Sequence, residues 1–385
     1  DSQLQETFLQ HAQNPENLYA LAYMMGYKPR VTNVSEVELT VTQTVSALAP
    51  SYNPNWDQAL RVNDNSSVKA NARGNTVFLI DDAIDFGFSS SYDPTNVQVL
   101  SSDGSNPAQY ELTKKVKAYS GKITEVEKEF TTAEKFYTMN IEANDIIGVL
   151  EIIDADGNEY YEVPFLAQDT IFDTETNTNS DNYLVPNTVK LKKVPRRFVT
   201  RFLNESTLQI QFGSGNPSDT DEEVTPNPTN IGLGLPFEQN KLTTAYSPTN
   251  FIFTNTYGVA PTNTTLTVRY LTGGGVTSNV PANSLVVPIT SGVKFLASSL
   301  NSNTAQYIFD SFATNNPNAA TGGQNGDTLL EIRENSLSNY GTQLRNVTAD
   351  DYLIRALSMP PKYGGISKAF IQKPLVNNTG ADLDL

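Results

Sequence analysis

The chain has 385 residues with a formal net charge of −16 at pH 7, no cysteine and a single histidine. These counts exclude disulfides, zinc–thiolate centres and thiol catalysis, and they leave too little histidine for a metal cage or a Ser-His-Asp triad. The acidic balance argues against non-specific binding to nucleic acid or to an anionic membrane, and no apolar run is long enough to predict a transmembrane helix.

Residues 1–31 are predicted to be helical, in two pieces separated at Asn14. Asn14 is a good N-cap, Pro15 fits the first helical position, and Glu16 suits the positive end of the helix dipole. Gly26 ends the helical period. The apolar residues that recur at helical spacing are Leu18, Leu21, Ala22 and Met25. Two interpretations stay open: an ordinary core helix, or a helix shared with a partner chain.

Residues 32–204 are predicted to form a β-rich domain, because the hydrophobic period changes from helical spacing to alternation. The clearest strand alternates over residues 37–45. A hairpin is predicted over 151–163, with Asp156-Gly157 at its turn, and a strand pair over 198–211. Since 385 residues exceed one ordinary core, we expect two or three domains. The expected fold class is α+β, predominantly β.

A basic island interrupts this acidic chain between residues 190 and 201. Its members are Lys190, Lys192, Lys193, Arg196, Arg197 and Arg201. One interpretation is a solvated strand edge. The other is a contact to an acidic partner, including a second copy of this same chain.

The β-rich region is predicted to continue over residues 205–300, with a long loop at 213–250 that is rich in glycine and proline. A strand follows, in which Leu266, Val268 and Tyr270 share one face. The glycine run at 273–275 does not predict a phosphate-binding loop, because neither a lysine nor a helix follows it.

Residues 301–385 are predicted to hold a helical hairpin that leads into a strand. Asp327 is the expected cap of the first helix, whose period breaks at residues 339–341. Thr348 is the expected N-cap of the second helix, with Asp351 as the acidic partner of a capping box.

The strand after this hairpin is expected at residues 366–371, once two prolines have stopped the second helix. A single strand needs a partner for its backbone. It must pair with the β-rich region, with another chain, or with residues beyond 385, and the sequence leaves open whether the chain continues.

Three short motifs stand out in the second half of the chain. The first joins glycines, arginines and a capped helix: Gly322, Gly323, Glu331, Ile332, Arg333, Arg345, Val347, Thr348, Asp351 and Tyr352. The second follows a strand and consists of Gly273, Gly274, Asn279 and Pro281. The third is the turn Gly213-Ser214-Gly215. Together they resemble the baseplate J-like family, the large ring-forming wedge proteins of contractile-tailed bacteriophages. The resemblance covers residues 205–372 and departs from the family at Ser214, where an acid is usual.

This resemblance implies a structural role and no enzymatic activity. Such a wedge subunit pairs with copies of itself and with other wedge proteins, and it forms the ring around the hub that rearranges when the sheath contracts. The partner contacts implied for this chain are Leu18, Leu21, Ala22, Met25, Arg333, Arg345, Asp351 and Tyr352. The motif residues given structural roles are Gly213, Gly215, Gly273, Gly274, Asn279, Pro281 and Thr348.

The resemblance also implies a location and a set of absences. The protein is expected in the tail baseplate of the virion, after assembly in the host cytoplasm. No cofactor or metal is expected, and no nucleic acid, membrane or small-molecule substrate.

The alternative function is a β-rich adhesin or carbohydrate-binding module. Trp56, the one tryptophan, lies in a polar loop and would then be a sugar platform. Its other interpretation is a packing residue at a core edge or an interface. A hydrolase that uses two carboxylates is a third hypothesis, but none of the 42 acidic residues is marked by its context.

Overall fold

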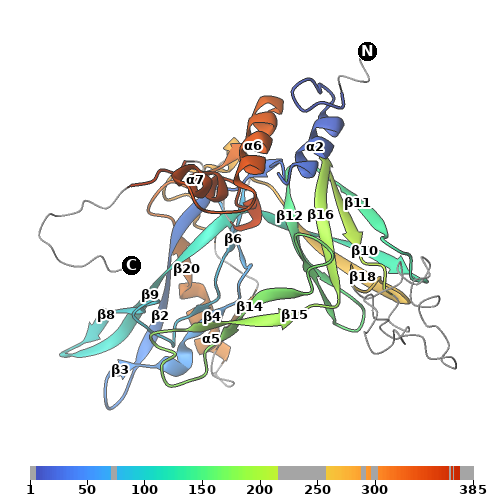
Figure 1. The fold of residues 1–385 in the computed structure, drawn as a ribbon. Helices are drawn as coiled ribbons and strands as arrows, with labels where there is room; N and C mark the ends of the chain where they lie inside the picture. The colour runs from blue at the N-terminus through green and yellow to red at the C-terminus, as the bar shows by residue number, and fades with distance from the viewer. Residues whose placement is uncertain are drawn as a thin grey trace, which may run out of the picture.

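The computed structural model describes residues 6–70, 76–215, 257–287, 292–295, 302–363, 366 and 368–372. In this part of the chain four α-helices accompany two seven-stranded sheets and three smaller sheets (Figure 1). The helices are α2 (Pro15–Met24), α5 (Ser302–Ser311), α6 (Leu329–Thr342) and α7 (Ala349–Leu357). The expected α+β fold, predominantly β, is confirmed.

The first large sheet has the strand order β20-β2-β9-β6-β5, with β3 beside β2 and β8 beside β9. Its strands are β2 (Glu36–Leu48), β3 (Asn53–Pro54), β5 (Ser67–Lys69), β6 (Val77–Ile80), β8 (Asn96–Asp103), β9 (Asn106–Ser120) and β20 (Ala313–Asn315). The predicted alternation of β2 is confirmed, because Leu39 and Val41 are buried whereas Glu38 is exposed. The long central pair is β2 with β9.

The core of the first sheet combines two distant parts of the chain. A small sheet of β19 (Val293–Phe295), β4 (Leu60–Val62) and β7 (Ile84–Asp85) contributes to it, next to the 3-10 turn η1 (Trp56–Gln58). Apolar side chains from residues 37–118 pack there with five buried ones from the other part: Val280, Leu285, Ile308, Phe312 and Ala320.

The second large sheet has the strand order β10-β18-β12-β13-β16-β17-β11. Its strands are β10 (Lys122–Phe130), β11 (Thr138–Glu142), β12 (Ile146–Ile153), β13 (Glu159–Glu162), β16 (Arg197–Asn204), β17 (Thr207–Phe212) and β18 (Thr264–Thr272). Neighbouring strands are antiparallel except for β13 and β16, which are parallel. The expected hairpin around Asp156-Gly157 is confirmed by β12 and β13, and Gly157 has φ +83°.

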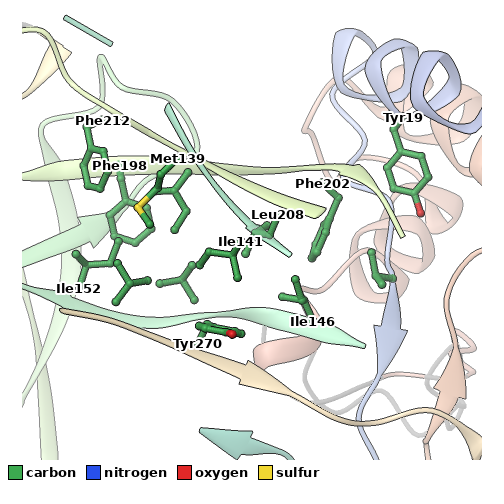
Figure 2. Close-up of a cluster of buried hydrophobic side chains, with 14 of the residues drawn as sticks. Tyr19, Met139, Ile141, Ile146, Ile152, Phe198, Phe202, Leu208, Phe212 and Tyr270 are labelled. Carbon is green, nitrogen blue, oxygen red and sulfur yellow. The ribbon is translucent and has the colours of Figure 1, made fainter. Parts of the chain in front are cut away.

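The second sheet closes around a core of aliphatic and aromatic side chains. Figure 2 shows Met139, Ile152 and Phe212 among the side chains that face one another between its strands. Phe212 meets Tyr160 edge to face, with ring centroids 5.7 Å apart. Tyr19 from α2 and Ile332 from α6 belong to the same cluster, so the two helices complete this core.

The chain enters and leaves the second sheet at one place. Strand β9 ends at Ser120, β10 begins at Lys122, and Lys122 lies opposite Thr272 in β18. A Cβ on Gly273 would lie 3.6 Å from the Cα of Gly121, so these two glycines are neighbours. A third apolar cluster connects the sheets: Val34, Leu79, Tyr119, Ile147 and Leu271.

The range expected as a β-rich domain, 32–204, contributes strands to both large sheets, whereas its expected continuation, 205–300, contributes β17 and β18 to the second large sheet and β19 to the small sheet beside the first. The expected boundary between the two ranges, at residues 204 and 205, falls in the turn that joins β16 to β17. Of the expected loop at 213–250, residues 216–250 lie outside the described part of the chain.

The N-terminal prediction is right for α2 and wrong for residues 6–13. Residues 6–13 form turns, because the Glu6 carboxylate accepts hydrogen bonds from the backbone N–H groups of Gln13 and Asn14, at 3.0 and 3.1 Å. This contact closes the segment on itself. The N-cap at Asn14 is confirmed, since its side chain accepts a hydrogen bond from the Glu16 N–H.

The C-terminal helices are present, but α6 differs from expectation at both ends. Thr328, not Asp327, is its N-cap and forms a capping box with Glu331. The helix also continues through residues 339–341 instead of breaking there. Asn339 is buried close to Gly26, just beyond the end of α2, so tertiary packing outweighs the local preference. The capping box of α7, between Thr348 and Asp351, is confirmed.

The strand expected at residues 366–371 is wrong, because the described residues 366 and 368–371 have no strand structure. After α7 the chain forms the 3-10 turn η4 (Pro361–Tyr363) against β12. Phe370 is exposed, and no strand of the described chain pairs with residues 366 and 368–372.

Candidate functional site

The glycines of the first two motifs meet at one place, which we call the glycine junction: residues 32–33, 273–279 and 322–327. Strand β1 (Thr32–Asn33) pairs there with β21 (Gln324–Asn325). Gly274 has φ +93°, and a Cβ on it would lie 2.8 Å from Thr32 Oγ1 and 2.9 Å from the Asn33 carbonyl oxygen. Glycine is required at 274 because two backbones pass too closely for any side chain.

Asn279 joins the second motif to the first across this junction. It follows the 3-10 turn η3 (Val276–Ser278). Its Nδ2 donates to the Gly323 carbonyl oxygen at 2.8 Å, and its Oδ1 accepts from the Gly323 N–H at 3.0 Å. The side-chain amide thus acts as a strand partner for Gly323. A Cβ on Gly323 would lie 2.4 Å from Ser278 Oγ, so this glycine is also required.

Asp327 fastens the end of the junction to the segment after α2. Its Oδ2 accepts from the Tyr27 hydroxyl at 2.5 Å, and its Oδ1 accepts from Arg30 Nη2 at 3.0 Å. Arg30 Nη1 also donates to the Leu357 carbonyl oxygen at 3.1 Å. One arginine therefore connects the junction to the last turn of α7.

The charges of this cluster are set by burial and by Asp327. Burial raises the pKa of the Tyr27 phenol, and the Asp327 carboxylate raises it further. Burial alone would lower the pKa of Arg30, but the attraction of Asp327 outweighs it and the pKa is raised. The phenol therefore stays neutral and the guanidinium stays charged, which makes the cluster a permanent tie rather than an acid–base pair.

Glu162, in β13, ties two segments that are far apart in the sequence to the second sheet. Its carboxylate accepts hydrogen bonds from Lys28, at 3.0 Å, and from Lys362 and the Thr200 hydroxyl. Burial would raise the pKa of Glu162, but Lys28, Lys362 and Thr200 together outweigh it and hold the pKa at about 2. Lys28 follows α2, and Lys362 lies in η4 after α7. One carboxylate of the second sheet therefore holds, as a clamp, the segments that follow these two helices.

These clusters fasten distant segments of the chain to one another. Among the described residues, no cluster of three or more His, Cys, Asp or Glu side chains is arranged to hold a metal ion. A cavity of about 590 Å³ lies near residues 63–65. Four carboxylates line it, Asp64, Glu125, Glu151 and Glu159, and two of them, Glu125 and Glu151, are paired with Arg269. The helices of the described chain are too short or too polar to span a membrane.

The other motif positions also sit at close backbone contacts. A Cβ on Gly213 would lie 2.1 Å from the Gly258 carbonyl oxygen, and the Gly215 N–H donates to that same oxygen at 2.9 Å. The Pro281 carbonyl oxygen accepts from Asn316 Nδ2 at 2.9 Å. These residues therefore lie where separate segments of the chain pass close together.

No protein-family model and no curated protein sequence matches the chain. The resemblance to baseplate wedge proteins therefore rests on the motif residues themselves.

The partner face expected on α2 is wrong for its two central residues. Leu18 and Ala22 are completely buried in the core that α2 shares with the second sheet and α6, while Leu21 packs against that cluster and Met25 is half-buried. The interpretation as an ordinary core helix therefore applies. The sequence left both interpretations open because apolar spacing does not say which surface covers it.

The expected contact residues of the C-terminal motif divide into two groups. Arg333 donates from Nη2 to the Ala12 carbonyl oxygen, and Asp351 belongs to the capping box of α7, so both are engaged within the chain. Arg345 and Tyr352 are exposed. Arg345 donates to the Gln343 side chain at 2.9 Å, a contact within the turn that joins the two helices.

The basic island is largely neutralised inside the chain. Lys190 pairs with Glu175, Lys192 pairs with Asp173 at 2.9 Å, and Arg197 is buried. Lys193 and Arg201 remain exposed, so the positive charge of the island is reduced but not removed.

Sequence reasoning missed the residues that hold the junction and the clamp. Asp327 was expected as a helix cap, and nothing marked Glu162 among the 42 acidic residues. Asn316 was also missed: it is fully buried, and its Oδ1 accepts from the N–H groups of Ser284 and Leu285, at 2.9 and 2.8 Å. The one available signal was the dense run of glycine and asparagine around these positions.

Helix α6 presents a second, exposed apolar face opposite its buried one. Ile332, Ser336 and Asn339 face the interior. The exposed face carries Leu330 and Leu337, seven residues apart and 64% and 43% exposed, and Leu344 follows at the same interval just beyond the helix. Tyr340, also exposed, lies between them. We call these four residues the α6 stripe.

Proposed function

We propose that the chain is a structural subunit of the baseplate wedge of a contractile phage tail. In this role it assembles with copies of itself and with other wedge proteins into the ring around the hub, which rearranges when the sheath contracts. The assignment to a phage baseplate comes from the resemblance of the motif residues to the wedge family. The geometry supports it, because these motif residues tie strands and helices together through close backbone contacts and hydrogen bonds.

The observation that carries the proposal is the α6 stripe. Leu330 and Leu337 lie about two turns apart on the exposed side of α6, where they form an apolar surface that a partner helix can cover. Solvent-exposed leucines at this spacing, on a helix whose other face is fastened into a core, favour a helical partner. The half-buried apolar residues of α7, such as Leu353 and Leu357, widen the surface beside it.

Isolation of tails tests the location. The chain is expected in the tail fraction of purified phage particles, in an amount comparable with that of the other baseplate proteins, as measured by quantitative mass spectrometry. Its absence from that fraction would refute the proposal.

A substitution on the stripe tests the contact. In a pull-down of the tagged full chain with the proteins encoded beside its gene, Leu337→Asp is expected to lose a bound tail protein and to keep the melting temperature. The matched control is Val99→Asp, which places the same charge on an exposed apolar residue of β8. Equal binding by both variants would show that the stripe is not the contact.

A carbohydrate-binding module is the second candidate, because Trp56 is 44% exposed in η1 with the exposed Tyr52 nearby in sequence. Exposed aromatic rings are the usual platform for sugar rings. Glycan-array binding that disappears in Trp56→Ala and persists in Val99→Asp would favour this function over the structural one.

A further inference from the structure

Strands β14 (Thr170–Thr176) and β15 (Asn187–Lys193) form a two-stranded ribbon that pairs with no other strand of the described chain (Figure 1). Phe172 lies opposite Leu191, and Val189 lies opposite Thr174, all on one face. Phe172, Leu191 and Val189 are 76%, 70% and 66% exposed. An isolated two-stranded ribbon is only marginally stable. Large exposed apolar surfaces mark contacts with other molecules, so an exposed apolar face on such a ribbon is unusual.

The opposite face of the ribbon is ionic and is fastened to the second sheet. Lys192 pairs with Asp173 and donates to the Tyr161 hydroxyl of β13 at 2.6 Å. At the base of the ribbon, the buried Arg197 donates from Nη1 to the Val194 carbonyl oxygen at 2.8 Å. Because its base and its ionic face are both held, the ribbon presents the apolar face as a fixed platform.

We infer that this apolar face is a contact between two copies of the chain. The inference deepens the proposed function and rests on it for its biological setting. The distribution of charge indicates that a second copy of the chain covers this face. The whole chain carries −16, so two copies repel each other over most of their surface. Residues 169–196 contain four acidic and four basic residues and are neutral. The ribbon is therefore a place where two acidic copies can approach without repulsion.

The ribbon face is also complementary to itself. It carries a large cross-strand pair, Phe172 with Leu191, next to a smaller one, Thr174 with Val189. The two-fold axis lies in the plane of the contact, midway between the two pairs and at right angles to the strands. It places the large pair of each copy on the small pair of the other. An isologous contact of this kind closes after two copies and needs no second surface.

Sedimentation equilibrium of the full chain, over a range of concentrations, tests the inference. The wild-type chain is expected to dimerise. Leu191→Asp and Phe172→Asp are each expected to weaken the dimer by about tenfold or more, because each would bury a carboxylate in an apolar contact. Both side chains are largely exposed in the single chain, so folding, followed by circular dichroism, is expected to be unchanged.

A charge exchange tests the geometry. Leu191→Asp alone and Val189→Lys alone are both expected to be monomeric, whereas an equal mixture of the two is expected to associate, since the two-fold arrangement places residue 191 over residue 189. A wild-type chain that stays monomeric, or a dimer unaffected by both ribbon substitutions, would overturn the inference.

Leu337→Asp on the α6 stripe separates this inference from the proposed function. The stripe variant is expected to keep the dimer, and Leu191→Asp is expected to keep the tail-protein contact. A wild-type chain that is present in purified tails but forms no dimer through the ribbon would remove only the inference. A ribbon dimer of a chain that is absent from tails would remove only the proposed function.

Discussion

Replacing Glu162 by glutamine removes the charge of the clamp and leaves its shape in place. The carboxylate is only 18% exposed, and it lies between Lys28 and Lys362, two residues from opposite ends of the described chain. The substitution leaves both ammonium groups without their shared partner. We expect a clear loss of stability at neutral pH, because a little-exposed ion cluster is costly to break from one side.

The size of the loss follows from the pKa of Glu162. Folding lowers this pKa from 4.5 to about 2, which corresponds to about 3 kcal/mol of stability at neutral pH. Because the folded-state value is the lower one, the contribution is fully present above pH 4.5. It declines as the pH falls below 4.5 and is lost near pH 2. The glutamine side chain of the variant cannot ionise, so the difference between wild type and variant isolates this group from all other carboxylates.

Urea unfolding of both proteins between pH 7 and pH 2 measures that difference. We expect Glu162→Gln to be less stable by about 3 kcal/mol at pH 7, and the two curves to converge near pH 2. The matched control is Glu175→Gln, which breaks the exposed pair with Lys190 and should cost less than about 1 kcal/mol. A difference that stays constant down to pH 2, or equal effects of the two substitutions, would refute the reasoning.

Two other substitutions test the junction and the C-terminal helices. Gly323→Ala should cost about 1–3 kcal/mol in urea unfolding, because its Cβ would overlap Ser278 Oγ, whereas Gly341→Ala, with nothing within 4 Å of the added atom, should be neutral or stabilising. Equal costs at the two glycines would contradict the close packing at the junction. Thr348→Ala should weaken α7 by about 1 kcal/mol, seen as faster amide hydrogen exchange confined to that helix; unchanged exchange would show that the capping box contributes nothing there.

Elements with local stop and start signals could be predicted from the sequence. The caps at Asn14 and Thr348 and the turn at Asp156-Gly157 each lie within the few residues that they organise. Prediction failed where a distant contact decides. Glu6 closes residues 6–13 into turns, and the packing of Asn339 next to the end of α2 keeps α6 helical through a sequence that favours a break.

The candidate site was only half visible for the same reason. The motif glycines marked positions of close backbone approach, yet no spacing rule indicates that Asn279 pairs with Gly323. Nor could periodicity distinguish the buried face of α2 from the exposed stripe of α6, because both carry apolar residues at helical spacing. Only the packed chain shows that Leu18 is covered and that Leu337 is not.

The pairing of β20 with β2 has a consequence for synthesis. Strand β2 ends at Leu48, and its neighbour β20 begins at Ala313, after the entire second sheet. At typical translation rates this interval lasts on the order of 10–50 seconds. During that time β2 can pair with β9, but its other edge stays uncovered on the nascent chain. Open strand edges are templates for wrong pairing, so this edge is where a growing chain would need protection by a chaperone.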